Sequence, residues 1–94
     1  MVVSVNDALS KEVLMRVHSR IADNVRRQRK IKKISQLSLA TEMGHKAVGL
    51  VSFAEAGINN KHFNIEHLAT IAKILDISIF DLFEGVDQIL KKSE

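Results

Sequence analysis

The sequence predicts an all-α fold with five helices in a single domain. The chain has 94 residues, a length that suits one domain and not two. It contains no proline, no tryptophan and no tyrosine, and this β-poor composition favours helices. Hydrophobic residues make up 46% of the chain and recur at three- and four-residue steps between short capping residues.

The first helix is predicted to begin near residues 6–10, where short polar capping residues cluster, and to reach about Lys32. Its other faces carry most of the arginines of the chain. One apolar stripe recurs every four residues along it: Val13, Val17, Ile21 and Val25.

Two short helices are predicted next. Ser35 can cap the second helix, and Gly44 ends it. The third helix spans residues 46–56 and is closed by Gly57. Only about two residues around Gly44 join the pair, and two helices with a tight glycine-containing turn are typical of a helix-turn-helix.

The last third of the sequence predicts a loop and two further helices. Residues 58–63 form a polar loop with one apolar anchor, Phe63, and Asn64 caps the fourth helix. Ser78 and Asp81 have capping-box spacing, so we expect them to open a fifth helix that runs nearly to the chain end. Gly85 weakens the middle of this helix by roughly 1 kcal/mol relative to alanine.

Positive charge is concentrated in residues 16–36, which contain eight arginines and lysines but only one acidic residue, Asp23. Acidic residues gather late in the chain. One basic face suggests a polyanionic partner, and the alternative is a solvated helix surface. Few aromatic residues are present, 4% of the chain, which argues against stacking on single-stranded nucleic acid.

Several functional classes find no support in the residues. The chain has no cysteine, so disulfides, thiolate metal sites and cysteine nucleophiles are excluded. His62 and His67 lack helical ligand spacing, and Ser52 lacks a G-x-S-x-G setting, so we expect no metal, no cofactor and no enzyme. No apolar run approaches the ~18 residues of a membrane span, and no secretory signal is visible. We therefore expect a cytoplasmic protein without a membrane partner.

Four motifs in chain order carry a resemblance to a known family. They are the basic stretch at 21–36, S-Q-L-S-L-A-T-E-M-G at 35–44, V-S-F-A-E-A-G at 51–57, and L-x-x-I-A-K-x-L-x-I-S-x-x-D-L-F at 68–83. Together they resemble the lambda-repressor-like (XRE, Cro-type) helix-turn-helix domain of bacterial and phage regulators. The resemblance implies that residues 1–94 form one DNA-binding domain. Its family-like core is 21–83, preceded by an N-terminal extension at 1–20 and followed by a C-terminal helix end at 84–94.

The resemblance implies a sequence-specific regulator of transcription that binds double-stranded DNA. Helix termini suit phosphates, the third helix would lie in the major groove, and the following loop would run near the backbone. Each candidate also has an alternative role. The Ser52 hydroxyl could bond back to its own helix, and Phe53 could lie in the core. The loop residues could serve only to form an ordinary turn. The candidate DNA contacts are Gln36, Lys46, Ala47, Val48, Gly49, Leu50, Ser52, Phe53, Asn59, Asn60 and Lys61.

Two further roles follow from the resemblance. Arg29 and Glu55 match a structural ion pair that ties the third helix to the first. A looser similarity to restriction–modification controller proteins implies a homodimer on a palindromic operator, with one helix of each subunit entering a half-site. The candidate dimer interface is Val86, Ile89 and Leu90, and the alternative is that a monomer packs these residues internally.

Two alternative functions remain open on the same fold. Residues 47–50 are apolar where the family commonly has polar residues that contact bases, so the third helix could bind a protein, as in an antitoxin or an adaptor subunit. The basic first helix would equally suit a nonspecific, nucleoid-type DNA binder.

Overall fold

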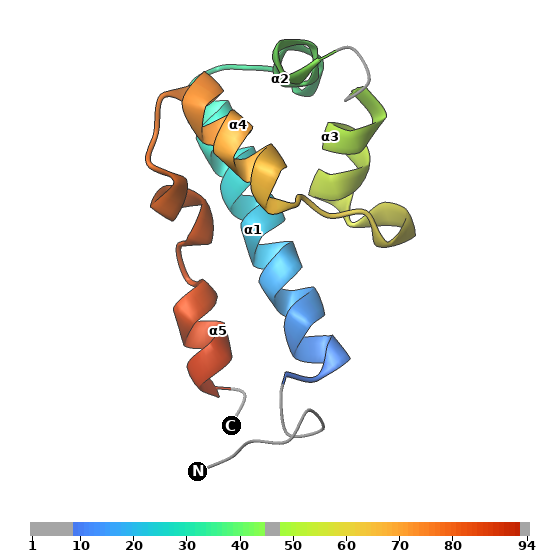
Figure 1. The fold of residues 1–94 in the computed structure, drawn as a ribbon, viewed down its shortest axis with the longest axis vertical. Helices are drawn as coiled ribbons and strands as arrows, with labels where there is room; N and C mark the ends of the chain where they lie inside the picture. The colour runs from blue at the N-terminus through green and yellow to red at the C-terminus, as the bar shows by residue number, and fades with distance from the viewer. Residues whose placement is uncertain (1–8, 45–47, 93–94) are drawn as a thin grey trace.

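The structure, a computed structural model, describes residues 9–44 and 48–92, and these ranges are helical with no strand. Figure 1 shows the arrangement of the helices. The α-helices are α1 (Lys11–Ile31), α2 (Gln36–Met43), α3 (Val48–Ala56), α4 (Ile65–Leu75) and α5 (Val86–Lys92). Two 3₁₀ helices lie between them, η3 (Ile58–Asn60) and η4 (Ile79–Phe83). The predicted all-α class is therefore confirmed.

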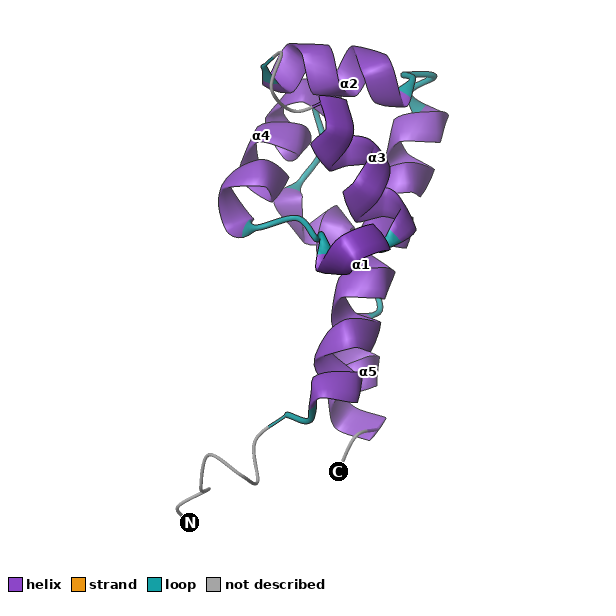
Figure 2. Cartoon of the chain, turned by 90° about the vertical axis from the view of Figure 1, so that its right-hand side faces the viewer, coloured by secondary structure: helices purple, strands orange, loops and turns teal. Residues whose placement is uncertain are grey.

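The 21 residues of α1 form the axis of the molecule. Around its C-terminal half lie α2, α3, α4 and η4, whereas α5 runs alongside its N-terminal half (Figure 1). Seen from the side, α1 and α5 extend together below the main helical body (Figure 2). The molecule thus has a packed body and a two-helix arm.

Side-chain caps fix the starts of three helices. Ser10 and Ser35 each accept a hydrogen bond from the backbone N–H three residues later, as the sequence predicts for a cap. Asn64 accepts from the N–H of His67 at 2.8 Å, and His67 Nδ1 accepts from the N–H of Asn64 at 3.0 Å. This reciprocal pair is a capping box with histidine in the place of the usual glutamate.

The core lies where the body helices meet α1. The apolar stripe of α1 contributes Ile21 and Val25, and Phe63 is the buried anchor predicted for the loop before α4. Burial of such side chains contributes roughly 1.5–3 kcal/mol each. The other core residues are Leu39, Ala40, Val51, Ala54, Leu68, Ile71, Ala72, Leu75 and Leu82.

The prediction of one continuous fifth helix is wrong. The chain instead forms η4, breaks at Glu84 and Gly85, and resumes as α5. The capping-box prediction is also wrong, because the Ser78 hydroxyl accepts from the N–H of Phe80, at 3.2 Å, and not from Asp81. Gly85 has a φ of +84°, a left-handed conformation that cannot continue a helix.

We expect Gly85→Ala to destabilise the protein by about 2 kcal/mol, from left-handed strain and a lost hydrogen bond. A Cβ at this position would lie 2.5 Å from the Arg20 guanidinium, whose Nε donates to the Glu84 carbonyl at 3.0 Å. Urea unfolding measures the change. Gly49→Ala is the control, because Gly49 is helical with open space around its Cβ position and should gain slight stability. A Gly85→Ala variant as stable as the parent would contradict this account.

Candidate nucleic-acid interface

The third helix, α3, is held by one face and exposed on the other. Val51 and Ala54, three residues apart, are buried against the core, and Glu55 is only 4% exposed. This inner face packs on α2 and α1. Among the residues of α3 whose side chains the structure describes, the exposed ones are Gly49, Ser52, Phe53 and Ala56.

Glu55 is the centre of a charged network that ties α3 to α1. Arg29 Nε donates to Glu55 Oε2 at 2.9 Å and Arg29 Nη2 donates to Oε1 at 3.0 Å, a bidentate pair. The predicted ion pair is present. Arg29 Nη1 also donates to the Ile34 carbonyl at 2.8 Å, and Arg26 Nη2 donates to the Glu55 carbonyl at 3.0 Å.

The Glu55 carboxyl remains ionised in this setting. Burial by itself raises its pKa, because the charged form loses hydration. Hydrogen bonds from Arg29 and Gln36, with the charges of Arg29 and Arg26, outweigh this effect and hold the pKa of Glu55 below its ordinary value. The carboxylate is therefore a permanent anchor for α3 near neutral pH.

Gln36 has a different contact from the one expected. Its Nε2 donates to Glu55 Oε1 at 2.9 Å, so the side chain belongs to the Glu55 network. The prediction for this residue is a contact with DNA, whereas its amide N–H binds the buried carboxylate of Glu55 on α3. Gln36 still opens α2, whose N-terminal backbone N–H groups suit an anion.

The other candidate contacts fall into three groups. Ser52 and Gly49 are exposed and Phe53 is 40% exposed, whereas Leu50 is half-buried against the core. Lys46 and Ala47 lie outside the described residues, as does the side chain of Val48. The exposed loop candidates are Asn59, Asn60 and Lys61.

The loop candidates lie beside α3. The 3₁₀ helix η3 follows α3 through Gly57, whose φ of +68° turns the chain back. Asn59 and Asn60 also have positive φ values, +58° and +57°. Figure 2 views the molecule from the side that carries α3, with α2 above it. The structure thus brings the outer face of α3 and the following loop to one side of the molecule.

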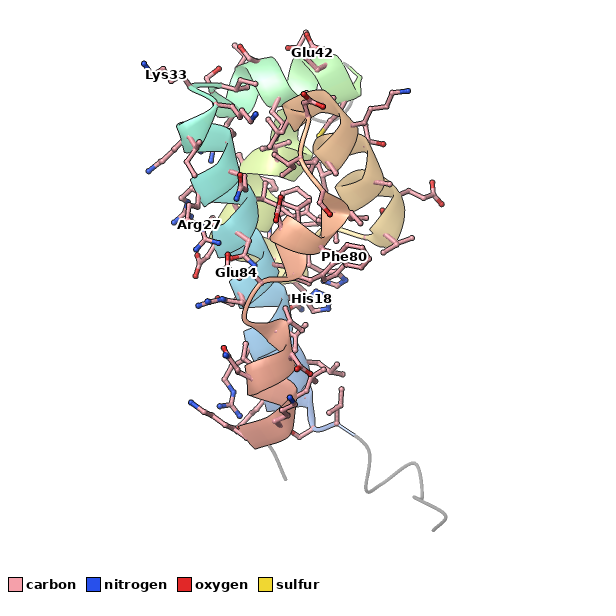
Figure 3. All side chains as sticks on the ribbon, turned by 90° about the vertical axis from the view of Figure 1, so that its left-hand side faces the viewer. His18, Arg27, Lys33, Glu42, Phe80 and Glu84 are labelled. Carbon is pink, nitrogen blue, oxygen red and sulfur yellow. The ribbon has the colours of Figure 1, made fainter. Side chains whose placement is uncertain are left out.

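Exposed lysines surround the junction between α1 and α2. Lys30, Lys32 and Lys33 are exposed there, and Figure 3 shows Lys33 pointing outward beside α2. Arg27 has a separate role, because its Nη2 lies 2.6 Å from Glu84 Oε2 in an exposed ion pair (Figure 3). The basic stretch of the sequence therefore has two parts: exposed lysines at the α1–α2 junction, and Arg27, which forms an ion pair with Glu84.

The candidate dimer residues of α5 contact the chain itself in part. Val86 is half-buried against the core, and Ile89 is half-buried. Leu90 is 36% exposed. The structure therefore assigns Val86 a packing role between α5 and α1.

Asn24 is fully buried and is not among the residues predicted from the sequence. Its Nδ2 donates to the carbonyls of Leu82 and Glu84, at 3.0 and 2.9 Å. The available signal was a polar residue three positions after Ile21, on the apolar stripe of α1. A polar residue at such a position is satisfied by a specific buried partner.

Other site types find no support in the part of the chain that the structure describes. No group of three or more histidines or acidic residues there could hold a metal ion. No described helix combines the length and the apolar character that crossing a membrane requires. Comparisons with protein-family models, with curated proteins and with solved structures found no match for this chain.

Proposed function

We propose that this protein is a sequence-specific, double-stranded-DNA-binding regulator of transcription, with α2 and α3 as a helix-turn-helix of the lambda-repressor type. The placement of α3 supports the proposal most directly. The helix is fixed from behind by the bidentate Arg29–Glu55 pair, and Ser52 and Phe53 face outward. The major groove, about 12 Å wide, accepts one helix held in this way.

Within this proposal, the exposed residues divide by chemistry. The Ser52 hydroxyl can donate to or accept from a base edge, and the Phe53 ring can contact a thymine methyl group. Asn59, Asn60 and Lys61 suit phosphate oxygens beside the groove. The lysines at the α1–α2 junction add long-range attraction, which accelerates association.

We further propose that the regulator acts as a homodimer on a palindromic operator and represses transcription by blocking the promoter. Each subunit would place its α3 in one half-site, with the two half-sites about 34 Å apart. Ile89 and Leu90, at the far end of the two-helix arm, are the residues we assign to the interface.

A protein-binding function is the second candidate, and one observation favours it. The exposed residues of α3 in the described part carry no charge, and Phe53 leaves 40% of its surface exposed. Such a surface also suits an apolar protein partner, as in an antitoxin or an adaptor subunit.

Selection of duplexes from a random library at about 0.15 M salt tests these functions against one another, because this salt suppresses weak electrostatic binding. Recovery of an inverted repeat is the result we expect. Binding that appears only at low salt, with no recovered motif, would instead indicate a nonspecific binder. No DNA binding at either salt concentration would favour the protein-binding function.

On the selected site, we expect Ser52→Glu to weaken binding at least about tenfold, or roughly 1.4 kcal/mol. The new carboxylate would face the DNA from the centre of the exposed side of α3. Thr70→Glu is the matched control, because Thr70 is also an exposed hydroxyl residue inside a helix, α4. Fluorescence anisotropy measures both variants. Equal losses would show a net-charge effect alone and would remove α3 from the interface.

A further inference from the structure

A cavity of about 460 Å³ lies between the N-terminal half of α1 and the corner formed by α3 and η3. Small-molecule sites in proteins have volumes of about 300–1,000 Å³, so the cavity is large enough for a small organic ligand. It lies away from Gly49 and Ser52, which do not line it.

Part of the cavity lining is apolar. Leu14 and Met15 of α1 line it and remain 43% and 58% exposed, and Ala22 and Ala54 contribute buried surface. Apolar side chains of this size that stay open to solvent inside a concave surface favour a ligand with an apolar body.

Two histidines face one another at the cavity. The rings of His18 and His62 stack with centroids 3.8 Å apart and an interplanar angle of 21°. His18 Nδ1 is buried and has no hydrogen-bond partner among the described residues. Burial, and to a lesser extent the charge of His62, lower the pKa of His18. Figure 3 places His18 where α1 leaves the helical body. A buried ring nitrogen without a partner is an unfilled polar position.

The charged groups around the cavity are predominantly cationic. Lys11 and Lys61 line it from α1 and from the loop after η3. Glu55 is the acidic residue of the lining, but its carboxylate already accepts hydrogen bonds from Arg29 and Gln36. An anion entering the cavity therefore meets lysines and imidazoles, and no free carboxylate among the lining residues.

We propose that this cavity binds a small amphipathic organic anion, with its apolar body against Leu14 and Met15 and its carboxylate near Lys61 and the His18 imidazole. The volume sets the size of the ligand, the apolar lining residues select its body, and the lysines select its charge. The unpartnered His18 nitrogen offers a hydrogen-bond position. This site is separate from the proposed DNA contacts on α3, but it shares Asn60 and Lys61 with the proposed phosphate contacts of the following loop.

Titration with 1-naphthoate, followed by the histidine imidazole signals in NMR spectra of the full chain, tests the proposal. A ligand with roughly thirteen non-hydrogen atoms and ordinary ligand efficiency should bind with a Kd of about 1 mM or tighter. We expect saturable shifts of His18 and His62. 1-Naphthamide has the same rings without the charge and should bind at least about tenfold more weakly if the cationic groups contribute as proposed.

A matched pair of variants separates a built site from general adsorption to apolar surface. Met15→Glu places a carboxylate in the cavity. Ile31→Glu introduces the same charge at the C-terminal end of α1, where Ile31 is 62% exposed. Both positions are exposed, so both variants should fold. We expect Met15→Glu to weaken naphthoate binding at least about tenfold and Ile31→Glu to leave it unchanged. Equal losses in both variants, equal binding of the two probes, or shifts that do not saturate would each overturn the proposal.

Discussion

Replacing Glu55 by alanine is expected to lower the free energy of unfolding by about 3–5 kcal/mol, the cost of breaking one side of a buried ion pair. The Glu55 side chain is 0% exposed, and Arg29 is 7% exposed as a residue. Without the carboxylate, the Arg29 guanidinium stays buried without a counter-charge, and Gln36 Nε2 loses its acceptor. Native domains are stable by only about 5–15 kcal/mol, so this loss is a large part of the total.

Thermal and urea unfolding measure this loss. For a domain of this size, 1 kcal/mol corresponds to a Tm shift of about 4–8 °C, so we expect Tm to fall by at least about 12 °C. Glu84→Ala is the control, because Glu84 pairs with Arg27 on the surface, where the side chains are 64% and 45% exposed. Such a pair contributes at most about 1 kcal/mol. Similar small losses in both variants would mean that Arg29 reaches solvent when Glu55 is removed.

The same ion pair makes stability depend on pH. Glu55 has a folded-state pKa below its ordinary value of 4.5, so its contribution is present above pH 4.5 and is lost as pH falls through the folded pKa. We expect the parent to lose stability in acid more steeply than Glu55→Gln, which lacks this titration. The Gln variant should be the less stable protein at neutral pH and should approach the parent as pH falls. Parallel stability curves for the two proteins would be inconsistent with a paired Glu55.

Helix starts could be predicted from the sequence because their signals are local. Ser10, Ser35 and Asn64 each precede an apolar pattern, and each caps the helix expected after it. A capping side chain contacts a backbone N–H only three residues away, so neither the rest of the chain nor the packing is needed to recognise it.

The break before α5 could not be predicted in this way. The pattern from Ser78 to Asp81 favours a helix start, and continuation past Gly85 costs only about 1 kcal/mol by propensity. The chain turns at Glu84 because its carbonyl accepts from both Asn24 and Arg20, which lie some sixty positions earlier. Hydrogen bonds over this separation outweigh local preference, and no spacing rule reveals them.

The candidate sites differ in the same way: one contact could be predicted from the sequence, and the others depend on tertiary packing. The Arg29–Glu55 pair was predicted from family resemblance, because both residues occupy recognisable motif positions. The cavity was not predicted, because His18 and His62 come together only through the packing of the loop after η3 against α1. The engagement of Gln36 with Glu55 is likewise a tertiary contact that the position of Gln36 in α2 does not reveal.

Replacing Asn24 by leucine is expected to cost about 2–4 kcal/mol, because the buried Leu82 carbonyl loses its donor and the Glu84 carbonyl keeps only the hydrogen bond from Arg20. Asn24 is 0% exposed, and its Nδ2 serves the carbonyls of Leu82 and Glu84. Its Oδ1 also accepts from Arg27 Nη2 at 3.1 Å. Leucine has a similar size but offers none of these contacts, so packing alone cannot restore the loss.

Two further substitutions separate hydrogen bonding from shape. Asn24→Asp keeps the shape but directs an oxygen at the two carbonyls, so it should destabilise at least as much as leucine. Asp23→Leu, on the exposed neighbour, should change stability by no more than about 0.5 kcal/mol.

Urea unfolding measures these effects, and amide hydrogen exchange locates them. Because Asn24 joins α1 to the segment that leads into α5, protection should fall most in α5, which carries the proposed dimer residues Ile89 and Leu90. A stable leucine variant with an unchanged α5 would mean that helix packing, and not the buried amide, holds the two-helix arm together.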